Sequence, residues 1–130
     1  MIGLLDNWLI KNMIRDFKNL EIWRLAHSLT LDIYKVTKDF PKEEKYGIIS
    51  QMRRASSSIP ANIAEGCWKY TSEDFIHYLH NARGSLSEIM YFLILAKDLN
   101  YLDVNTFQEL TDSYIILGRQ LNAFITSIRK

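Results

Sequence analysis

A run of apolar residues spaced alternately four and three apart constrains this chain more than any other feature of its sequence. The run consists of Phe75, Leu79, Ala82, Leu86, Ile89, Leu93 and Ala96. Residues at this spacing share one face of an α-helix, and a seam that continues without a break is typical of helices that pack at a shallow angle in a bundle. We therefore expect the chain to fold around this helix as a helical bundle.

Three further segments carry apolar residues at a similar spacing. Their predicted core positions are Leu20, Trp23, Ala26, Leu29, Ile33, Val36 and Phe40, then Ile48, Met52, Ala55, Ile59 and Ile63, and finally Leu110, Tyr114, Leu117, Leu121, Phe124 and Ile128. The predicted helices lie near residues 20–38, 43–66, 72–99 and 103–128. Thr71, followed by Glu73 and Asp74, is a helix N-cap signature. Because the connections are short, we predict an all-α, antiparallel up-down-up-down four-helix bundle.

The length of the chain, 130 residues, suits one domain. We expect a bundle domain over residues 18–130, preceded by an N-terminal extension over residues 1–17. Apolar residues recur at helical spacing in the extension, which predicts either an amphipathic helix that docks on a neighbouring surface or a loose terminus. Asp6, Lys11 and Arg15 interrupt these apolar residues, so we expect no membrane span.

Pro60 lies inside the apolar period of the second predicted helix. A proline has no N–H, so it leaves the carbonyl of Ser56 without its helical partner. The sequence therefore predicts a kink at Pro60. The hydroxyls of Ser56, Ser57 and Ser58 are expected to satisfy the freed backbone groups locally.

The charges are nearly balanced, with 16 Lys and Arg against 15 Asp and Glu, for a net charge of +1. The bulk composition therefore does not attract nucleic acid or anionic lipid, and any basic surface must be local. The single cysteine, Cys67, cannot form an internal disulfide, and no signal-peptide pattern is present. We expect a cytoplasmic protein.

Reactive side chains are few. His77 and His80 are one helical turn apart and Glu73 is four residues before His77, but the neighbouring core seam places these histidines at its edge or outside, so we expect surface residues and no metal site. Cys67 lies near Lys69, yet no third group orients it, and we expect a small, semi-buried side chain. Without a G-x-S-x-G elbow or a Gly-rich phosphate loop, we expect no enzyme and no cofactor.

Basic residues gather around the second predicted helix. Arg53 and Arg54 are adjacent, Lys45 and Lys69 flank them, and Trp68 offers an aromatic ring that could stack on an unpaired base. These five residues are the candidates for a nucleic-acid-binding surface, and the nucleic acid we expect is RNA or single-stranded DNA. The alternative is that the arginines are solvated charges or form salt bridges between subunits.

The two arginines are expected to have different roles. A helix turns by about 100° per residue, so Arg54 lies about 200° from the buried Met52 and faces away from the core. Arg53 lies at the flank, where we expect it to bond the backbone carbonyls freed at Pro60. We predict that Arg54 binds phosphate and that Arg53 is structural.

Two features indicate self-assembly. Small residues surround Arg54 on the outer face of the second helix, namely Gly47, Ser50, Ser57 and Ala61. Residues 89–96, IMYFLILA, are apolar on all sides of a helix, so we expect a second subunit to cover them. A closed ring would repeat each arginine around its axis and form a positive collar. The alternative function is a structural hub that recruits a protein partner without nucleic acid.

Several motifs in fixed order resemble a bacterial family of four-helix bundle proteins that are encoded in intervening sequences of 23S rRNA genes. These motifs are LEIWRLAH, FPKEEKYG, SQMRRA, SIPANIAEG and GSLSE, and the resemblance covers residues 17–101. That family is in turn similar to the accessory variability determinant of diversity-generating retroelements, a pentameric bundle whose positive surface binds nucleic acid and a reverse transcriptase.

The resemblance implies a homopentameric ring of four-helix bundles with no catalytic activity. The matching basic positions are Arg53 and Arg54 in SQMRRA and Lys45 in FPKEEKYG. The chain departs from the family pattern after AEG, where it has Cys67, Trp68 and Lys69 instead of a phenylalanine, a glycine and a basic residue.

Overall fold

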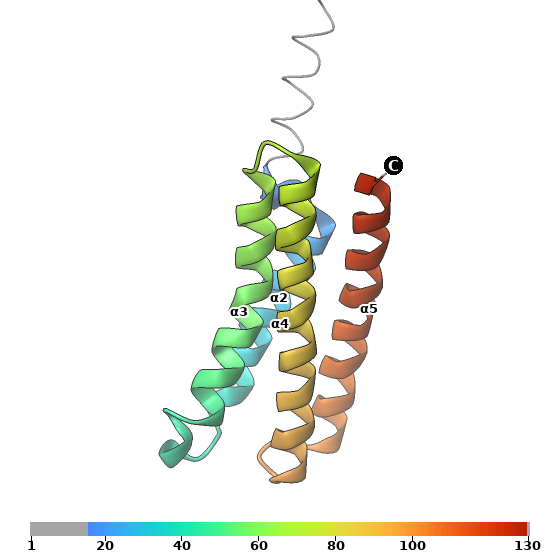
Figure 1. The fold of residues 1–130 in the computed structure, drawn as a ribbon. Coiled ribbons are helices and arrows are strands. Elements are labelled where there is room, and N and C mark those ends of the chain that lie inside the picture. The colour runs from blue at the N-terminus through green and yellow to red at the C-terminus, as the bar shows by residue number, and fades with distance from the viewer. Residues whose placement is uncertain (1–15, 130) are drawn as a thin grey trace, which may run out of the picture.

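The computed structural model describes residues 16–129, which form helices and turns without any strand. The four long helices are α2 (Glu21–Thr37), α3 (Ile48–Cys67), α4 (Ser72–Asp98) and α5 (Val104–Arg129). Two short 3-10 turns, η1 (Phe17–Asn19) and η2 (Lys42–Glu44), precede α2 and α3. Successive helices run in opposite directions, as Figure 1 shows. The predicted all-α four-helix bundle is confirmed.

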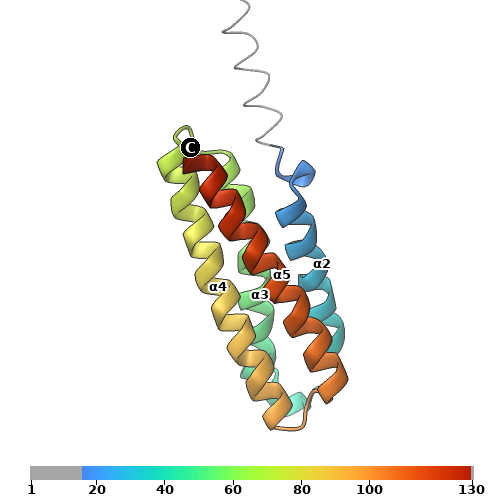
Figure 2. The same ribbon diagram turned by 90° about the vertical axis from the view of Figure 1, so that its right-hand side faces the viewer.

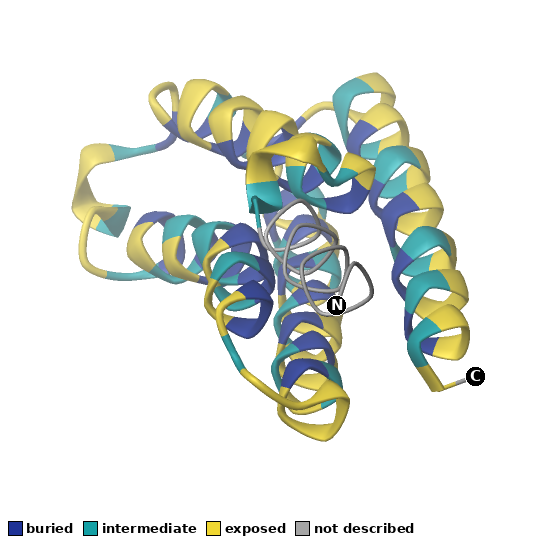
Figure 3. Cartoon of the chain, turned by 90° about the horizontal axis from the view of Figure 1, so that it is seen from above, coloured by how far each residue is buried: buried dark blue, intermediate teal, exposed yellow. Residues whose placement is uncertain are grey.

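The helices are arranged so that each packs against two neighbours. α3 packs between α2 and α4, and α5 packs between α4 and α2. Figure 2 shows α5 in front, with α4 on one side and α2 on the other. The buried residues face the interior of this arrangement (Figure 3). The α2–α3 side of the bundle therefore lies opposite the α4–α5 side.

The second long helix begins later than the sequence predicts. Residues 42–44 form η2, a turn follows, and α3 starts at Ile48 rather than near residue 43. Gly47 is the N-cap of α3, so it is not part of the outer helical face to which we assigned it. A β-carbon at Gly47 would come within 2.9 Å of Oε1 of Glu44, the flexible end of that side chain, and would lie 3.7 Å from the Glu44 carbonyl oxygen, so the turn has room for one.

The predicted cap of α4 is present. Oγ1 of Thr71 accepts a hydrogen bond from the backbone N–H of Asp74 at 3.1 Å, and acidic residues occupy the first turn. At the start of α5, the carboxylate of Asp103 accepts from the backbone N–H of Thr106 at 2.7 Å. These contacts satisfy amide groups that a helix leaves unpaired at its N-terminus.

The predicted core seam of α4 is buried at every position, and so are the predicted core positions of α3. The prediction of buried positions is less accurate for α2 and α5. In α5 the buried residue near the C-terminus is Ile125, whereas Phe124 and Ile128 are half-buried, and in α2 Ile22 and Thr37 are buried instead of Trp23 and Val36. A straight helix has 3.6 residues per turn, so its inward face drifts away from a strict four-three repeat.

α3 is helical on both sides of Pro60, and the kink predicted there remains a prediction. The prediction that serine hydroxyls of the same helix satisfy the freed backbone groups is wrong for the carbonyl of Ser56. This carbonyl accepts a hydrogen bond from Oγ1 of Thr30 on α2 at 3.0 Å. The serine hydroxyl of residue 56 donates instead to the carbonyl of Arg53. The hydroxyl of a helical serine reaches back to the preceding turn of its own helix, so the hydroxyls of Ser56, Ser57 and Ser58 do not reach the carbonyl of Ser56.

Cys67 is fully buried, so the prediction of a semi-buried side chain is wrong. The helix continues one residue beyond Gly66, and Cys67 is its last residue, on the side that faces the core. Most of the predicted N-terminal extension, including its amphipathic segment, lies outside the described residues.

Candidate nucleic-acid interface

Arg53 binds α2. Its Nε donates to Oγ1 of Thr37 at 2.9 Å, and its Nη2 donates to the backbone carbonyl of Tyr34 at 3.3 Å. The guanidinium carbon lies 4.6 Å from the centroid of the Tyr34 ring. Oγ1 of Thr37 donates in turn to the carbonyl of Ile33 at 2.7 Å. Because the C-terminal end of a helix carries partial negative charge, a guanidinium is well placed at the last turn of α2.

These contacts agree with a structural role for Arg53 but correct its expected partner. We expected Arg53 to bond carbonyls freed at Pro60, and it bonds the last turn of α2 instead. The reason is direction: Arg53 lies on the flank of α3 that faces α2, and Pro60 is about two helical turns further along.

Arg54 is exposed on the outer face of α3, as predicted. Its Nη2 donates to Oε1 of Gln51, one turn earlier in the same helix, at 2.6 Å. Ser50 and Ala61 on this face are exposed and Ser57 is half-buried. Small neighbours leave the guanidinium accessible to a phosphate.

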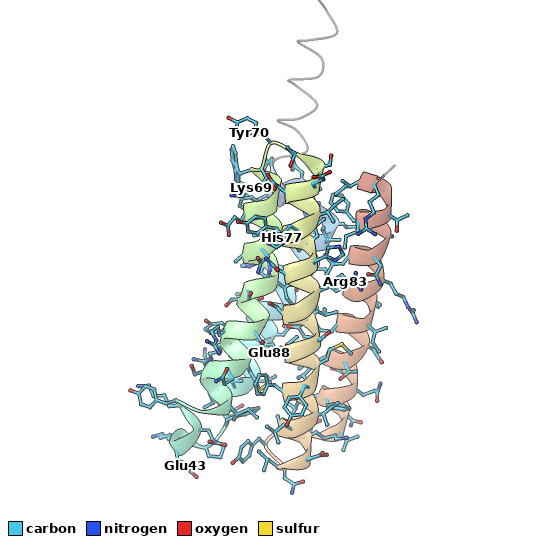
Figure 4. The ribbon with its side chains drawn as sticks, in the orientation of Figure 1. Glu43, Lys69, Tyr70, His77, Arg83 and Glu88 are labelled. Carbon is cyan, nitrogen blue, oxygen red and sulfur yellow. The ribbon has the colours of Figure 1, made fainter. Side chains whose placement is uncertain are left out.

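Lys45 lies just before α3, near the end of the bundle that carries Arg54. Its Nζ lies 5.4 Å from the ring centroid of Tyr46, and both residues are exposed. In Figure 4, Glu43 marks this end of the bundle, while Lys69 and Tyr70 mark the opposite end. Lys45 and Arg54 thus belong to one end of the molecule.

Trp68 and Lys69 are separated from the arginines. Trp68 is the C-cap of α3, fourteen positions after Arg54 by sequence number, which corresponds to about 21 Å along a helix. The residue is 63% exposed. Lys69 is half-buried, with its Nζ 5.0 Å from the ring centroid of Tyr78. The predicted site is therefore two groups, with Lys45, Arg53 and Arg54 near one end of α3 and Trp68 and Lys69 at the other.

Tyr46 is a candidate that the sequence analysis did not include. The residue is 88% exposed, and its ring lies next to Lys45. An exposed ring beside a cation is suited to stacking on an unpaired base. Adjacency to Lys45 in the sequence was the signal that could have identified it.

The histidines lie on the surface, as predicted. His77 and His80 are both exposed, and Nε2 of His80 lies 3.1 Å from Nη2 of Arg129. Within residues 16–129, no three His, Cys, Asp or Glu side chains are grouped so that they could hold a metal ion.

The sequence model of a family described as 23S rRNA-intervening sequence protein matches residues 18–123. The chain belongs to this family. It is also similar to a crystal structure from the S23 ribosomal protein family of Bacteroides thetaiotaomicron, described as a protein with unknown function. The two are 21% identical with a TM-score of 0.72, over 80% of this chain and 97% of the other, so this likeness concerns the fold.

No curated protein matches the chain in sequence. In the part of the chain that the structure describes, no helix is both long and apolar enough to cross a membrane.

Proposed function

We propose that this protein is a non-enzymatic, cytoplasmic homo-oligomer that binds RNA or single-stranded DNA through phosphate contacts made by Arg54. The resemblance described above implies five subunits. The observation that carries the proposal is the exposed guanidinium of Arg54, which is surrounded by small side chains and bonded only to a neutral glutamine among its identified partners. Because the glutamine is neutral, it does not offset the positive charge of the guanidinium, which can pair with a phosphate.

Assembly is part of the proposed mechanism. A chain with a net charge of +1 attracts nucleic acid only weakly as a monomer. In a closed ring, each Arg54 is repeated around the axis together with Lys45, and the exposed Tyr46 beside it offers a ring for base stacking. Trp68 and Lys69 form a second contact region at the other end of α3. Membership in a family described by 23S rRNA intervening sequences supports an RNA partner.

The test is the salt dependence of binding. A labelled single-stranded RNA oligonucleotide is titrated with the wild-type protein and with Arg54→Ala at about 50 mM and about 200 mM salt, and affinity is followed by fluorescence anisotropy. We expect wild-type affinity to fall steeply with salt because bound phosphates release counterions. Arg54→Ala should bind more weakly and lower the log–log slope by about 1 for each phosphate that the variant no longer binds.

Arg83→Ala is the matched control, since Arg83 is also an exposed helical arginine but lies on α4. It should bind RNA like the wild type. Equal losses for both variants would point to nonspecific charge attraction and contradict a site at Arg54. If the wild type binds no RNA at either salt concentration, the alternative of a hub for a protein partner takes the place of this proposal.

A further inference from the structure

Two guanidinium groups contact the same histidine at the junction of α4 and α5. Nη1 of Arg83 lies 3.4 Å from Nδ1 of His80, and Nη2 of Arg129 lies 3.1 Å from Nε2 of the same ring. Figure 4 shows Arg83 on α4, at the side next to α5. Arg129 is in the last turn of α5. All three residues are exposed, so a solute can reach this cluster.

The hydrogen-bonding groups of the cluster do not match one another. A guanidinium has only donors, and a neutral imidazole has one acceptor nitrogen and one N–H. If one guanidinium donates to the acceptor nitrogen of His80, the other guanidinium faces the N–H of the ring. A protonated ring would offer no acceptor to either arginine. The cluster therefore contains more N–H donors than it can pair by itself.

The positive charge of the cluster is not offset by an acid. Within residues 16–129, the ion pair is the one between Lys97 and Asp98, at 3.7 Å, so neither Arg83 nor Arg129 pairs with a carboxylate. Two positive charges held beside one ring repel each other. An anion that accepts hydrogen bonds from both guanidiniums would use the surplus donors and offset the charge.

The surface around the cluster also lacks acids. Residues 75–87 of α4 and residues 113–129 of α5 contain no aspartate or glutamate, and they include Arg119 in addition to the cluster. The two stretches pack against each other, since a β-carbon at Gly118 of α5 would lie 3.1 Å from Cδ2 of Leu86 on α4. An anion that approaches this junction therefore meets basic side chains without a neighbouring carboxylate.

The donors of the cluster fit a phosphate group with three terminal oxygens. Such a group carries about −1.5 to −2 charge at pH 7, which is close to the combined charge of two guanidiniums. A guanidinium can bind phosphate oxygens through two parallel N–H groups, and the imidazole N–H supplies a further donor. A phosphodiester carries a single charge and has one terminal oxygen fewer, so it fits less well.

We propose that His80, Arg83 and Arg129 form a binding site for inorganic phosphate or a phosphate monoester. The site goes beyond the function proposed above, because it lies on α4 and α5 whereas Arg54 lies on α3. A free phosphate and the 5′-phosphate of an RNA share this chemistry. RNA that ends in a 5′-hydroxyl contains only diester phosphates and should not occupy the site.

The first test is a titration of the protein with inorganic phosphate at constant pH and ionic strength. NMR follows the Cε1–H signal of His80, which is assigned with His80→Gln. We expect this signal to shift until it saturates at millimolar phosphate. Arg83→Ala and Arg129→Ala should each weaken binding at least about tenfold, because each variant lacks one charged donor. Arg119→Ala, an exposed arginine of α5 outside the cluster, is the matched control and should bind like the wild type.

RNA binding separates this site from the one at Arg54. With RNA that ends in a 5′-hydroxyl, Arg83→Ala should keep the wild-type affinity, and Arg54→Ala should lose affinity while its phosphate titration stays unchanged. The same RNA with a 5′-phosphate identifies the source of the anion. Tighter binding of the phosphorylated RNA that disappears in Arg129→Ala would show that the site takes an RNA end, and equal affinities would show that it takes a free phosphate.

Three results would overturn the proposal. The first is a His80 signal of the wild type that does not saturate at millimolar phosphate. The second is an equal loss of phosphate binding in Arg119→Ala, since this result indicates nonspecific attraction to positive charge. The third is a loss in only one of Arg83→Ala and Arg129→Ala, because the proposed site needs both guanidiniums. Circular dichroism melting confirms that the variants are folded, and none of these results depends on whether Arg54 binds RNA.

Discussion

The seam between α3 and α4 differs in packing from the seam between α2 and α5. At the α3–α4 seam, the hydroxyl oxygens of Ser58 and Ser85 are 2.9 Å apart, and a β-carbon at Gly66 would come within 2.8 Å of Phe75. Between α2 and α5, hollows of about 390 Å³ and about 340 Å³ open near the two ends of α5. Small side chains let α3 and α4 approach closely, whereas larger side chains leave space beside α5.

Buried polar atoms show the same contrast. Among the described residues, the buried side-chain oxygens without a hydrogen-bond partner are those of Thr111, Tyr114 and Gln120, all on α5. Burial raises the pKa of the Tyr114 hydroxyl, and the nearby Asp32 raises it further. A buried hydroxyl that donates to nothing does not stabilise the fold. The α3–α4 pair is therefore the more closely packed part of the bundle, and α5 is held mainly by its apolar face.

Truncating one buried leucine on α4 and one on α5 should have the largest effect on stability. Leu93 on α4 and Leu117 on α5 are both fully buried. Each substitution by alanine should lower the free energy of unfolding by about 2–5 kcal/mol. The loss should be greater for Leu93→Ala, because the loosely packed α5 can shift to fill part of the cavity that Leu117→Ala leaves. Urea unfolding followed by circular dichroism measures both losses. A greater loss for Leu117→Ala would contradict the difference between the seams.

The two glycines that face α4 differ in how much room they leave for a methyl group. At Gly66 a β-carbon would lie 2.8 Å from a ring carbon of Phe75 and 2.9 Å from the β-carbon of Tyr78, so Gly66→Ala should cost about 1–3 kcal/mol. At Gly118 the close atom is the flexible end of Leu86, and Gly118→Ala should be nearly neutral because alanine favours a helix. The melting temperatures of the two variants measure this difference in stability. Equal melting temperatures would show that α3 and α4 can separate easily.

Hydroxyl deletions should give the smallest effects. Ser85→Ala removes the hydrogen bond with Ser58 and should lower the free energy of unfolding by about 0.5–1.5 kcal/mol. Tyr114→Phe removes a hydroxyl without a partner and should leave stability unchanged or slightly raised. Chemical unfolding of the two variants side by side is the measurement. A loss of more than about 1 kcal/mol in Tyr114→Phe would mean that this hydroxyl has a partner and that α5 is held more firmly than its packing indicates.

The sequence predicted the fold best where helical periodicity alone decides burial. Every predicted core position of α4 is buried because this helix packs against both α3 and α5. The late start of α3 was missed because the acids at positions 43 and 44 suit a helix N-terminus as well as a 3-10 turn. The Thr30 donor to the Ser56 carbonyl depends on the register between two helices, which no local pattern contains.

The candidate site was predicted in part. The angular step of a helix was sufficient to place Arg54 outward and Arg53 on the flank. The partners of Arg53 on α2 required knowledge of how α2 and α3 pack. Grouping Trp68 with Arg54 overlooked the helical rise, which by itself separates them by about 21 Å.

The division of roles between the adjacent arginines is the central claim, and one paired measurement tests it directly. Arg53→Ala and Arg54→Ala are compared by thermal melting and by RNA binding at two salt concentrations. Arg53→Ala should melt at a lower temperature, because Thr37 and the last turn of α2 lose a charged donor, and should bind RNA with an unchanged salt slope. Arg54→Ala should melt like the wild type and bind RNA weakly with a flatter slope. Equal loss of binding by both variants with unchanged melting temperatures would contradict the account.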